Sequence, residues 1–289
     1  MKMLAVLLII LILIAVYIFI ESYNELRSFQ ITTYKVKDKN VPESLRDKTL
    51  CFVSDYHEAV GGRNNRKITE VIEKEKPDYI LIGGDMINGR EGEDVSPALE
   101  LMNTLSKRHE LFYCYGNHER KCEDNLYNSK EVMEEFSKGL SDRVHIVNNK
   151  SVYLNGYDSS GGVLCGLDIP SEYYKRLRRP EMTVDVMESL IGKKQDKEYV
   201  ILLAHDPENF GAYKEWNANL VLSGHIHGGL IRTRLLGALV SPRLSLFPRY
   251  SYGKYTEDDS TLIVTNGIGQ HSLKIKINNI PEAVIIKFE

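Results

Sequence analysis

Short apolar runs alternate with polar, helix-like stretches along most of the chain. Runs of apolar and β-branched residues predict strands, and apolar residues at helical spacing predict amphipathic helices. The predicted strands are residues 49–54, 79–83, 111–115, 151–154, 163–167, 199–204, 220–223, 261–265 and 283–288. The predicted helices are residues 65–76, 97–107, 129–139 and 183–191.

This order of elements predicts an α/β fold. Strands that alternate with helices in the first half indicate βαβ units and a mostly parallel sheet. The second half has more strands than helices, so we expect two mixed β-sheets packed face to face with helices outside. No repeat, low-complexity tract or Gly/Ser linker divides residues 48–289, which we interpret as one catalytic domain.

The amino-terminal segment differs from the rest, because residues 3–20 form an unbroken apolar run of 18 residues. A helix of this length spans ~27 Å, enough to cross the hydrocarbon core of a bilayer. No small-residue cleavage site follows the run, so we predict an uncleaved transmembrane anchor over residues 1–22 rather than a signal peptide. Residues 23–47 are polar and charged and predict a linker with a possible short edge strand.

The orientation of the anchor stays open. Only Lys2 precedes the apolar run, whereas Arg27, Lys35, Lys37 and Lys39 follow it. The positive-inside rule therefore mildly favours a cytoplasmic domain, although long domains are translocated despite such charges. We expect a single-pass protein of the cell membrane. The side of the membrane on which the catalytic domain lies stays open.

Composition weighs against nucleic-acid binding and indicates the state of the cysteines. The 289 residues carry 37 basic and 40 acidic side chains, a formal net charge of −3, so a strongly basic nucleic-acid surface is not expected. The four cysteines have no CxxC spacing, and we expect buried thiols rather than disulfides. The oligomeric state does not follow from the sequence.

The hexapeptide Gly224-His225-Ile226-His227-Gly228-Gly229 directly follows a predicted strand. Alone it fits two interpretations equally, a tight turn with surface histidines or a metal-binding turn. Four other predicted strands also precede residues that can bind a divalent cation. In chain order these residues are Asp55 and His57, then Asp85, then Asn117 with His118, and then His205. Because functional residues of α/β sheets gather at the carboxyl ends of strands, the five positions together favour a metal site.

The ordered motifs resemble those of the calcineurin-like metallophosphoesterase family: D-x-H, G-D, G-N-H-E, a single His and G-H-x-H. The matching segments are Asp55-Tyr56-His57, Gly84-Asp85, Gly116-Asn117-His118-Glu119, His205 and Gly224-His225-Ile226-His227. A bacterial branch with an amino-terminal membrane segment is most similar, because it shares G-H-T-H-G-G, a late glycine pair and N-x-P-E. The last two correspond to Gly267 with Gly269 and to Asn279-Ile280-Pro281-Glu282. The resemblance implies a four-layer αββα sandwich over residues 48–288.

The resemblance also implies two divalent metal ions bridged by Asp85. One ion would be held by Asp55, His57, Asp85 and His227, and the other by Asp85, Asn117, His205 and His225. A pair of cations can clamp a phosphate and supply a bridging hydroxide for in-line attack. His118 would stay unligated and act as the general acid. Carboxylate, amide and imidazole ligands without thiolate point to Mn²⁺, Fe or Zn²⁺.

Two flanking positions depart from the family pattern. Tyr56 and Glu58 stand beside the first motif, so we expect the rim of the pocket to differ from that of relatives. Asn88 occupies the position, three residues after Asp85, where purple acid phosphatases carry a tyrosine, so a tyrosinate-bound ferric centre is not expected.

Other basic and histidine residues receive a simpler interpretation. The segment 173–179 and the arginines after the histidine pair fit a solvated surface better than a rim that attracts anionic substrate or lipid headgroups. These arginines are Arg232, Arg234, Arg243 and Arg249. His109, His145 and His271 match no ligand motif, and we interpret them as structural or surface residues.

The sequence therefore predicts a membrane-anchored, binuclear metal-dependent phosphohydrolase. A phosphodiester or pyrophosphate in a lipid-linked or envelope compound is the favoured substrate, because an anchor keeps the site near the bilayer, although soluble substrates stay open. Two alternatives are a non-catalytic scaffold of the same fold and a nuclease of the same superfamily. The complete ligand set weighs against the scaffold, and the near-neutral charge weighs against the nuclease.

Overall fold

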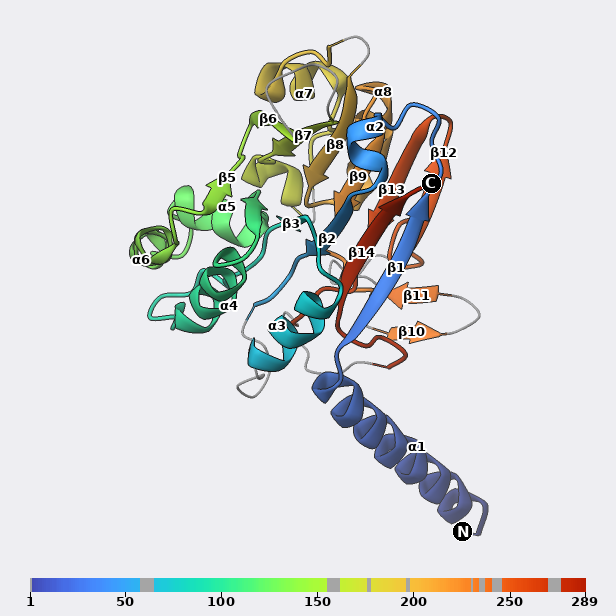
Figure 1. Cartoon of the computed structure of the whole chain (residues 1–289). Coiled ribbons are helices and arrows are strands. Elements are labelled where there is room, and N and C mark those ends of the chain that lie inside the picture. Colours follow the sequence, from blue (N-terminus) through green and yellow to red (C-terminus); the bar gives the residue numbers. More distant parts are fainter. Residues whose placement is uncertain are drawn as a thin grey trace.

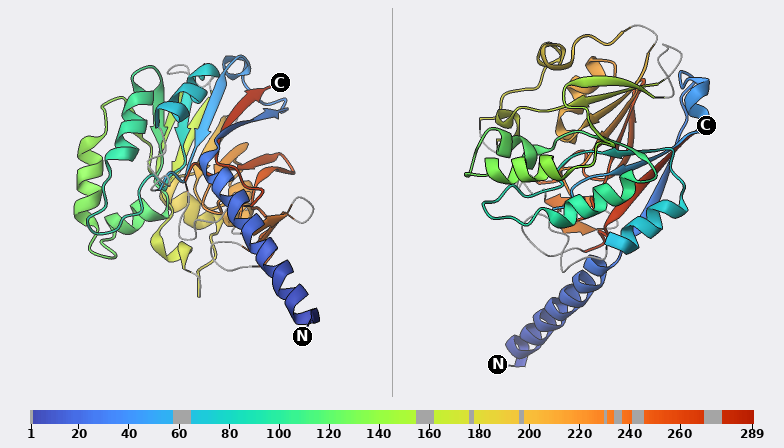
Figure 2. Two further views of the ribbon diagram at one scale, coloured as in Figure 1. Left: turned by 90° about the horizontal axis from the view of Figure 1, so that it is seen from below. Right: turned by 60° about the vertical axis from the view of Figure 1, so that its left-hand side comes forward.

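Two six-stranded sheets packed face to face, with helices on both outer sides, form the domain (Figure 1). The computed structural model describes residues 2–57, 65–154, 162–175, 178–195, 198–229, 231–233, 237–240, 246–269 and 277–289. Two turned views show the sheets between layers of helices (Figure 2). The predicted α/β architecture of four layers is therefore confirmed.

The first sheet has the strand order β1-β14-β2-β3-β4-β5. Its strands are β1 (Gln30–Val36), β2 (Thr49–Val53), β3 (Tyr79–Ile82), β4 (Glu110–Tyr113), β5 (Val144–Ile146) and β14 (Glu282–Phe288). β2 to β5 run parallel, whereas β14 is antiparallel to β2 and parallel to β1. β1 lies at the edge of this sheet, so the sheet includes residues that precede residue 48.

The second sheet has the strand order β12-β13-β9-β8-β7-β6. Its strands are β6 (Lys150–Leu154), β7 (Gly162–Leu167), β8 (Tyr199–Ala204), β9 (Leu220–Ser223), β12 (Gly253–Glu257) and β13 (Ser260–Val264). The four central strands are parallel and the two edge strands antiparallel. A small antiparallel pair, β10 (Ile231–Thr233) with β11 (Gly237–Val240), lies beside the sandwich.

Three apolar clusters account for the four layers. Between the sheets, Leu50 and Phe52 of β2 meet Ile201 and Leu203 of β8. Alternate residues of the same strands point away from the other sheet. Cys51 of β2 lies in the cluster between the first sheet and its helices, and Leu202 of β8 lies in the corresponding cluster of the second sheet. Because both faces of the central strands are covered, these strands are apolar at nearly every position. All four cysteines are buried and unbridged, as expected.

Helices cover the outer face of each sheet. The first sheet is covered by α3 (Asn65–Lys74), α4 (Ser96–Ser106), α5 (Asn117–Glu123) and α6 (Lys130–Gly139). The second is covered by η1 (Ser171–Tyr174), α7 (Val184–Ile191), η2 (Pro207–Asn209) and α8 (Phe210–Glu215). A further short helix, α2 (Glu43–Arg46), precedes β2 and contributes Leu45 to the cluster between the sheets.

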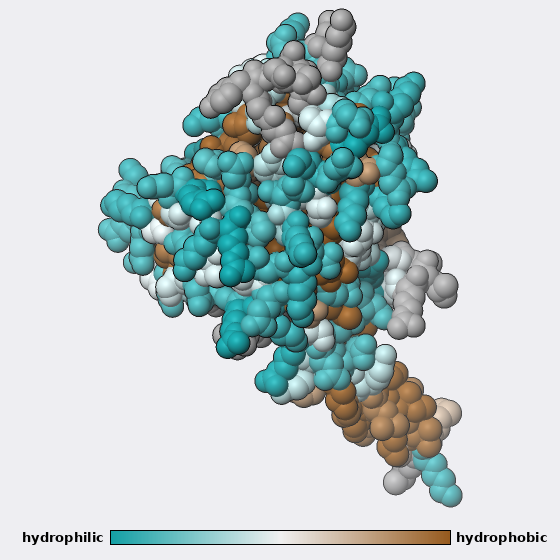
Figure 3. Space-filling view, viewed as in Figure 1, coloured by the Kyte–Doolittle hydropathy of each residue, from teal (hydrophilic) through white to brown (hydrophobic). Residues whose placement is uncertain are grey.

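α1 (Lys2–Arg27) extends away from the domain with its apolar stretch exposed (Figure 3). It is the one helix among the described residues that is long and apolar enough to cross a membrane, which is compatible with a single-pass membrane protein. Near its carboxyl end, Ser22, Glu25 and Leu26 are buried against the domain. The end of the helix is therefore seated on the protein rather than joined to it by a loose linker.

The strand directions place the functional edge of the first sheet on the side of α1. β1 begins where α1 ends, β14 runs parallel to β1, and β2 runs antiparallel to β14. β2 therefore ends at the edge where β1 begins, and the parallel strands β3 and β4 end there too. The residues that follow these strands lie on the side of the domain from which α1 extends (Figure 1).

Candidate metal centre

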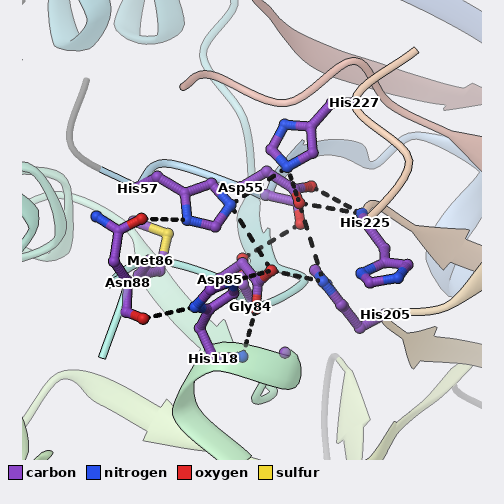
Figure 4. A network of polar contacts seen from close by, with 12 residues as sticks. Asp55, His57, Gly84, Asp85, Met86, Asn88, His118, His205, His225 and His227 are labelled. Atoms are coloured by element: carbon purple, nitrogen blue, oxygen red, sulfur yellow. Dashed lines mark hydrogen bonds and ion pairs between the residues drawn. The ribbon is translucent and has the colours of Figure 1, made fainter. Parts of the chain in front are cut away.

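The candidate aspartates and histidines follow strand ends and meet in one cluster (Figure 4). Asp55 and His57 follow β2, Asp85 follows β3, and Asn117 and His118 begin α5 after β4. His205 follows β8, and His225 and His227 follow β9. Three groups have ligand atoms within 4.8 Å of one another: Asp55, His57 and His227; Asp85, His205 and His225; and His57, Asp85 and His118.

Asp85 lies at the centre of the cluster. Its Oδ2 atom is 3.1 Å from Nε2 of His205, 3.7 Å from Nε2 of His57 and 4.0 Å from Nε2 of His118. Its other oxygen, Oδ1, accepts the backbone N–H of His118 at 2.9 Å. One oxygen of Asp85 is therefore close to three imidazole nitrogens at once.

The two histidines of the hexapeptide point to different sides of the site (Figure 4). Nε2 of His227 lies 3.3 Å from Oδ1 of Asp55 and 3.2 Å from Nε2 of His57. The ring of His225 instead faces that of His205, with 5.1 Å between ring centroids. Residues two positions apart therefore contribute to different groups of ligand atoms.

The backbone of the ligand loops adopts a conformation that is uncommon for residues with side chains. Asp55, His57, Asp85, His225 and His227 have φ angles of 55°, 41°, 54°, 67° and 51°. Left-handed backbone of this kind costs of order 1–3 kcal/mol per residue and persists where surrounding contacts hold it. Those contacts include the N–H of Asp55, which donates to Gly84 O at 2.9 Å. The loop conformations are therefore imposed by the fold.

Glycines stand where the ligand loops touch. Gly84 has a φ of 95°, and a side chain there would collide with the backbone of Gly116. A side chain at Gly224 would collide with the carboxylate of Asp55 and the hydroxyl of Ser54. The glycines of the motifs therefore allow neighbouring strand ends to approach closely enough for their ligands to meet.

Glu119 holds the loop that carries Asp85. Its buried carboxylate accepts four backbone N–H groups, from Asp85 at 2.9 Å, Met86 at 2.6 Å, Ile87 at 3.3 Å and Gly116 at 2.9 Å. The sequence marked Glu119 only as the last letter of a motif. Its position at the third residue of α5, after a glycine N-cap, was the available signal for this role.

Three histidines have one ring nitrogen engaged away from the cluster centre. Nδ1 of His205 is 2.7 Å from Gly83 O, and Nδ1 of His118 is 2.5 Å from Asn88 O. Nδ1 of His57 is 3.1 Å from the side-chain oxygen of Asn88. A carbonyl partner of this kind requires Nδ1 to carry the proton, which leaves Nε2 as the ligand atom facing the cluster. Asn88 therefore orients two of the histidines.

The charges of the cluster are strongly interdependent. Burial favours a neutral Asp85, yet His205, His118 and His57 hold its pKa well below the usual range. Burial favours a neutral His205, yet Asp85 and Asp55 raise the pKa of His205 to about 10. Burial raises the pKa of Asp55 to about 6 and, together with the charge of Asp85, that of Glu119 to about 7. The protonation state of each of these groups therefore depends on the charges of its neighbours.

The interpretation of segment 173–179 as a solvated surface is wrong for its aromatic residues. Tyr173 and Tyr174 are buried, because they pack under the second sheet with the helices of that face. The ring of Tyr174 lies 5.4 Å from that of His225 and lines the site. Arg179 is half-buried beside Glu208, at 3.0 Å, whereas Arg178 is exposed. Arg176 and Leu177 lie outside the described residues.

The structure also places the tyrosine of the first motif, two of the arginines and two of the other histidines. Tyr56 does not form a rim, because its ring is buried under the helices and its hydroxyl donates to Asn65 at 2.8 Å. Arg232 stacks on Tyr252 at 3.8 Å, and Arg249 pairs with Glu257 at 2.9 Å on the surface. His109 contacts Pro77 O and Glu73, and His145 is exposed. The predictions for Glu58, Arg234, Arg243 and His271 concern positions outside the described residues.

Comparison with known proteins gives a consistent picture. Residues 48–229 match the family model described as calcineurin-like phosphoesterase. A Helicobacter pylori metallophosphoesterase is 31% identical over 84% of this chain and 60% of its own length. A Bacillus subtilis metallophosphoesterase is 24% identical over 91% and 86%, respectively. A Danio rerio transmembrane protein with a metallophosphoesterase domain is 24% identical over 86% and 54%. The chain thus spans about 60% of the length of the Helicobacter relative.

Proposed function

The chain belongs to the calcineurin-like phosphoesterase family, and on that premise we propose that it is a membrane-anchored phosphohydrolase with two metal ions that cleaves a phosphodiester or pyrophosphate bond. The family and the cluster of Asp and His residues make it a metal-dependent phosphoesterase. The observation that carries the finer proposal is the central position of Asp85 between groups of ligand atoms supplied by different strand ends.

The side chains at the site fit a pair of divalent cations. Among the residues that the structure describes, none forms a hydrogen bond with the buried Oδ1 of Asn117, which suits an amide oxygen that ligates a metal. Asp55, His57, Asp85 and His227 would hold one ion, and Asp85, Asn117, His205 and His225 the other. The mixture of oxygen and imidazole ligands without thiolate suits Mn²⁺, Fe or Zn²⁺. When bound, the two ions supply the positive charge that activates water and stabilises the phosphoryl oxygens.

The protein groups around the ions would orient the substrate and move protons. Nδ1 of His118 is engaged with Asn88 O, so its Nε2 points toward the cluster, 4.0 Å from Oδ2 of Asp85. From there the ring can donate a proton to the oxygen that leaves the phosphorus, the role of a general acid. Tyr174 packs against the rings of His205 and His225 and belongs to the apolar cluster between the second sheet and its helices. It would therefore shield this side of the His205–His225 pair from water.

The position of the site supports a substrate at the membrane. α1 extends from the same side of the domain as the ends of β2, β3 and β4. An anchor on this side keeps the cluster close to the bilayer surface, where the phosphates of lipid-linked compounds lie. A lipid-linked or envelope phosphodiester or pyrophosphate is therefore the proposed substrate class.

A metal-exchange assay tests this proposal. The full-length chain in detergent is stripped with a chelator, resupplied with Mn²⁺, Fe²⁺ or Zn²⁺ in turn, and assayed with a chromogenic phosphodiester and monoester. We expect turnover that depends on metal, favours the diester and coincides with two bound ions per chain. Turnover by an Asp85→Asn variant equal to that of the parent, or no metal-dependent turnover by the parent, would contradict the enzyme and favour a binding scaffold.

A further inference from the structure

Asn279 lies between the end of the membrane helix and the loop that carries His227. Its backbone N–H donates to Oε2 of Glu25, near the carboxyl end of α1, at 2.9 Å. Its side-chain nitrogen donates to His227 O at 2.5 Å and to Gly229 O at 3.2 Å. One buried residue, 2% exposed, therefore contacts both α1 and the backbone of a candidate metal ligand.

The orientation of the Asn279 amide follows from its partners. Two carbonyl oxygens accept from the same nitrogen, so the NH₂ group must face the loop. An aspartate at this position would place a negative oxygen against both carbonyls. The contact therefore depends on a donor that asparagine has and its nearly isosteric acid lacks.

The His227 loop needs support from outside itself. His227, Gly228 and Gly229 have successive φ angles of 51°, 70° and 90°, all in the left-handed region. A side chain at Gly228 would collide with the amide oxygens of Asn266 and Asn279, so the loop lies directly on these two side chains. Glycine adopts this conformation freely, so the cost falls on His227, whose left-handed backbone persists only where surrounding contacts hold the loop.

The end of α1 is a fixed partner for Asn279. Glu25 is 6% exposed, and a carboxylate buried to this degree requires hydrogen-bond donors. The N–H of Asn279 is one such donor, and its bond to a charged acceptor is of the stronger kind. Leu26, also buried, keeps the same turn of the helix against the domain.

We propose that Asn279 is a positioning residue that couples the seating of α1, through Glu25, to the metal-holding conformation of His227. The ligand loop is held in its working conformation only while the end of the membrane helix is docked on the domain. This coupling rests on the proposed function, because it takes His227 as a ligand of one of two ions.

Conservative variants of the full-length chain in detergent test the coupling. Asn279→Asp removes the donor at nearly constant size, and Asn278→Asp makes the same chemical change at the half-buried neighbouring position. Bound Mn²⁺ is measured by mass spectrometry across buffered Mn²⁺ concentrations, and hydrogen exchange is measured at the Gly229 amide, which donates to Ile226 O. We expect roughly 10- to 100-fold weaker binding of one ion in Asn279→Asp, as for other outer-shell changes, with faster exchange at Gly229. Asn278→Asp should match the parent in both measurements.

A second pair of variants tests the coupling by changes in α1. Glu25→Ala removes the acceptor on α1, and Glu21→Ala changes a glutamate one turn earlier on the same helix. Only Glu25→Ala should speed exchange at Gly229 and weaken the same ion. Parent-like Mn²⁺ binding and exchange in either Asn279→Asp or Glu25→Ala would overturn the coupling. Absence of phosphoesterase turnover in the parent would instead overturn the proposed function. The two failures are distinguishable, because hydrogen exchange at Gly229 is measured independently of turnover.

Discussion

Nε2 of His57 and Nε2 of His227 lie 3.2 Å apart, although 170 positions separate the two residues in the chain. Their rings are nearly stacked, with an interplanar angle of 30°. Two ring nitrogens that face each other at this distance repel unless a proton or a cation lies between them. Because Nδ1 of His57 is engaged with Asn88, its Nε2 is the nitrogen left for a shared cation.

Removal of His57 and removal of His225 should each abolish binding of a different ion. His57→Ala takes a nitrogen from the group with Asp55 and His227, whereas His225→Ala takes one from the group with Asp85 and His205. We expect each variant to bind one ion per chain, with affinity for the lost ion reduced by more than the roughly 100-fold of outer-shell changes. Metal content after dialysis at buffered Mn²⁺ measures this, and His145→Ala, at an exposed histidine, is the control.

Loss of the same ion in both variants would contradict the division of ligands between two sites. The double variant, with both His57→Ala and His225→Ala, gives an independent test. It should bind no metal ion if the two histidines serve separate ions. Retention of one ion by the double variant would show that the two histidines do not serve separate ions.

Replacement of His118 should reduce turnover and leave metal content unchanged. His118→Asn removes the proposed general acid, so we expect kcat to fall by roughly 10²- to 10⁴-fold while KM changes little. A substrate whose leaving group is already a good anion should lose less, because it needs no proton. His118 also lies in a candidate group with His57 and Asp85, so an equal loss of metal and activity would make it a ligand instead.

Glu119→Gln should destabilise both the fold and the metal site. The glutamine presents an NH₂ group to backbone N–H groups that now donate to the carboxylate. Each buried N–H left without an acceptor costs about 1–3 kcal/mol, so we expect Tm to fall by several degrees. Glu123→Gln, an exposed change on the same helix, should leave Tm as in the parent. A parent-like Tm in Glu119→Gln would show that the Asp85 loop does not depend on this carboxylate.

Asp168 should make the chain less stable as pH rises from 5 to 8. Burial raises the pKa of Asp168 to about 6, although Arg120 opposes the shift at 3.1 Å. The folded chain therefore binds this proton more tightly than the unfolded chain does. The resulting stabilisation is complete below about pH 4 and is lost as pH rises through about 6, a change of about 1 kcal/mol between pH 5 and 8.

Asp168→Asn removes this titration and supplies the test. Relative to the parent, the variant should gain a few degrees in Tm between pH 5 and pH 8, measured on the full-length chain in detergent. Asp142→Asn, at an exposed position, should show no such relative change. A Tm difference between Asp168→Asn and the parent that is constant with pH would contradict the shifted pKa.

The central strands were predictable because burial on both faces requires apolar residues at nearly every position of the strand. β2, β3, β8 and β9 are apolar at nearly every position, and their candidate ligands follow directly at the strand ends. Short elements were missed. β5 and β10 have three residues each and α8 has six, too few to show a period of apolar positions.

By itself, the sequence determined the fold class, the family and the candidate metal-binding residues, because each depends on short segments read in order. Only the tertiary structure decided which of these residues meet, since the pairing of His57 with His227 and of His205 with Asp85 depends on strand order and register. It likewise decided that Tyr174 is buried beside His225 and that Asn279 joins α1 to the His227 loop. Contacts between distant segments leave no periodic trace in either segment, so local patterns do not reveal them.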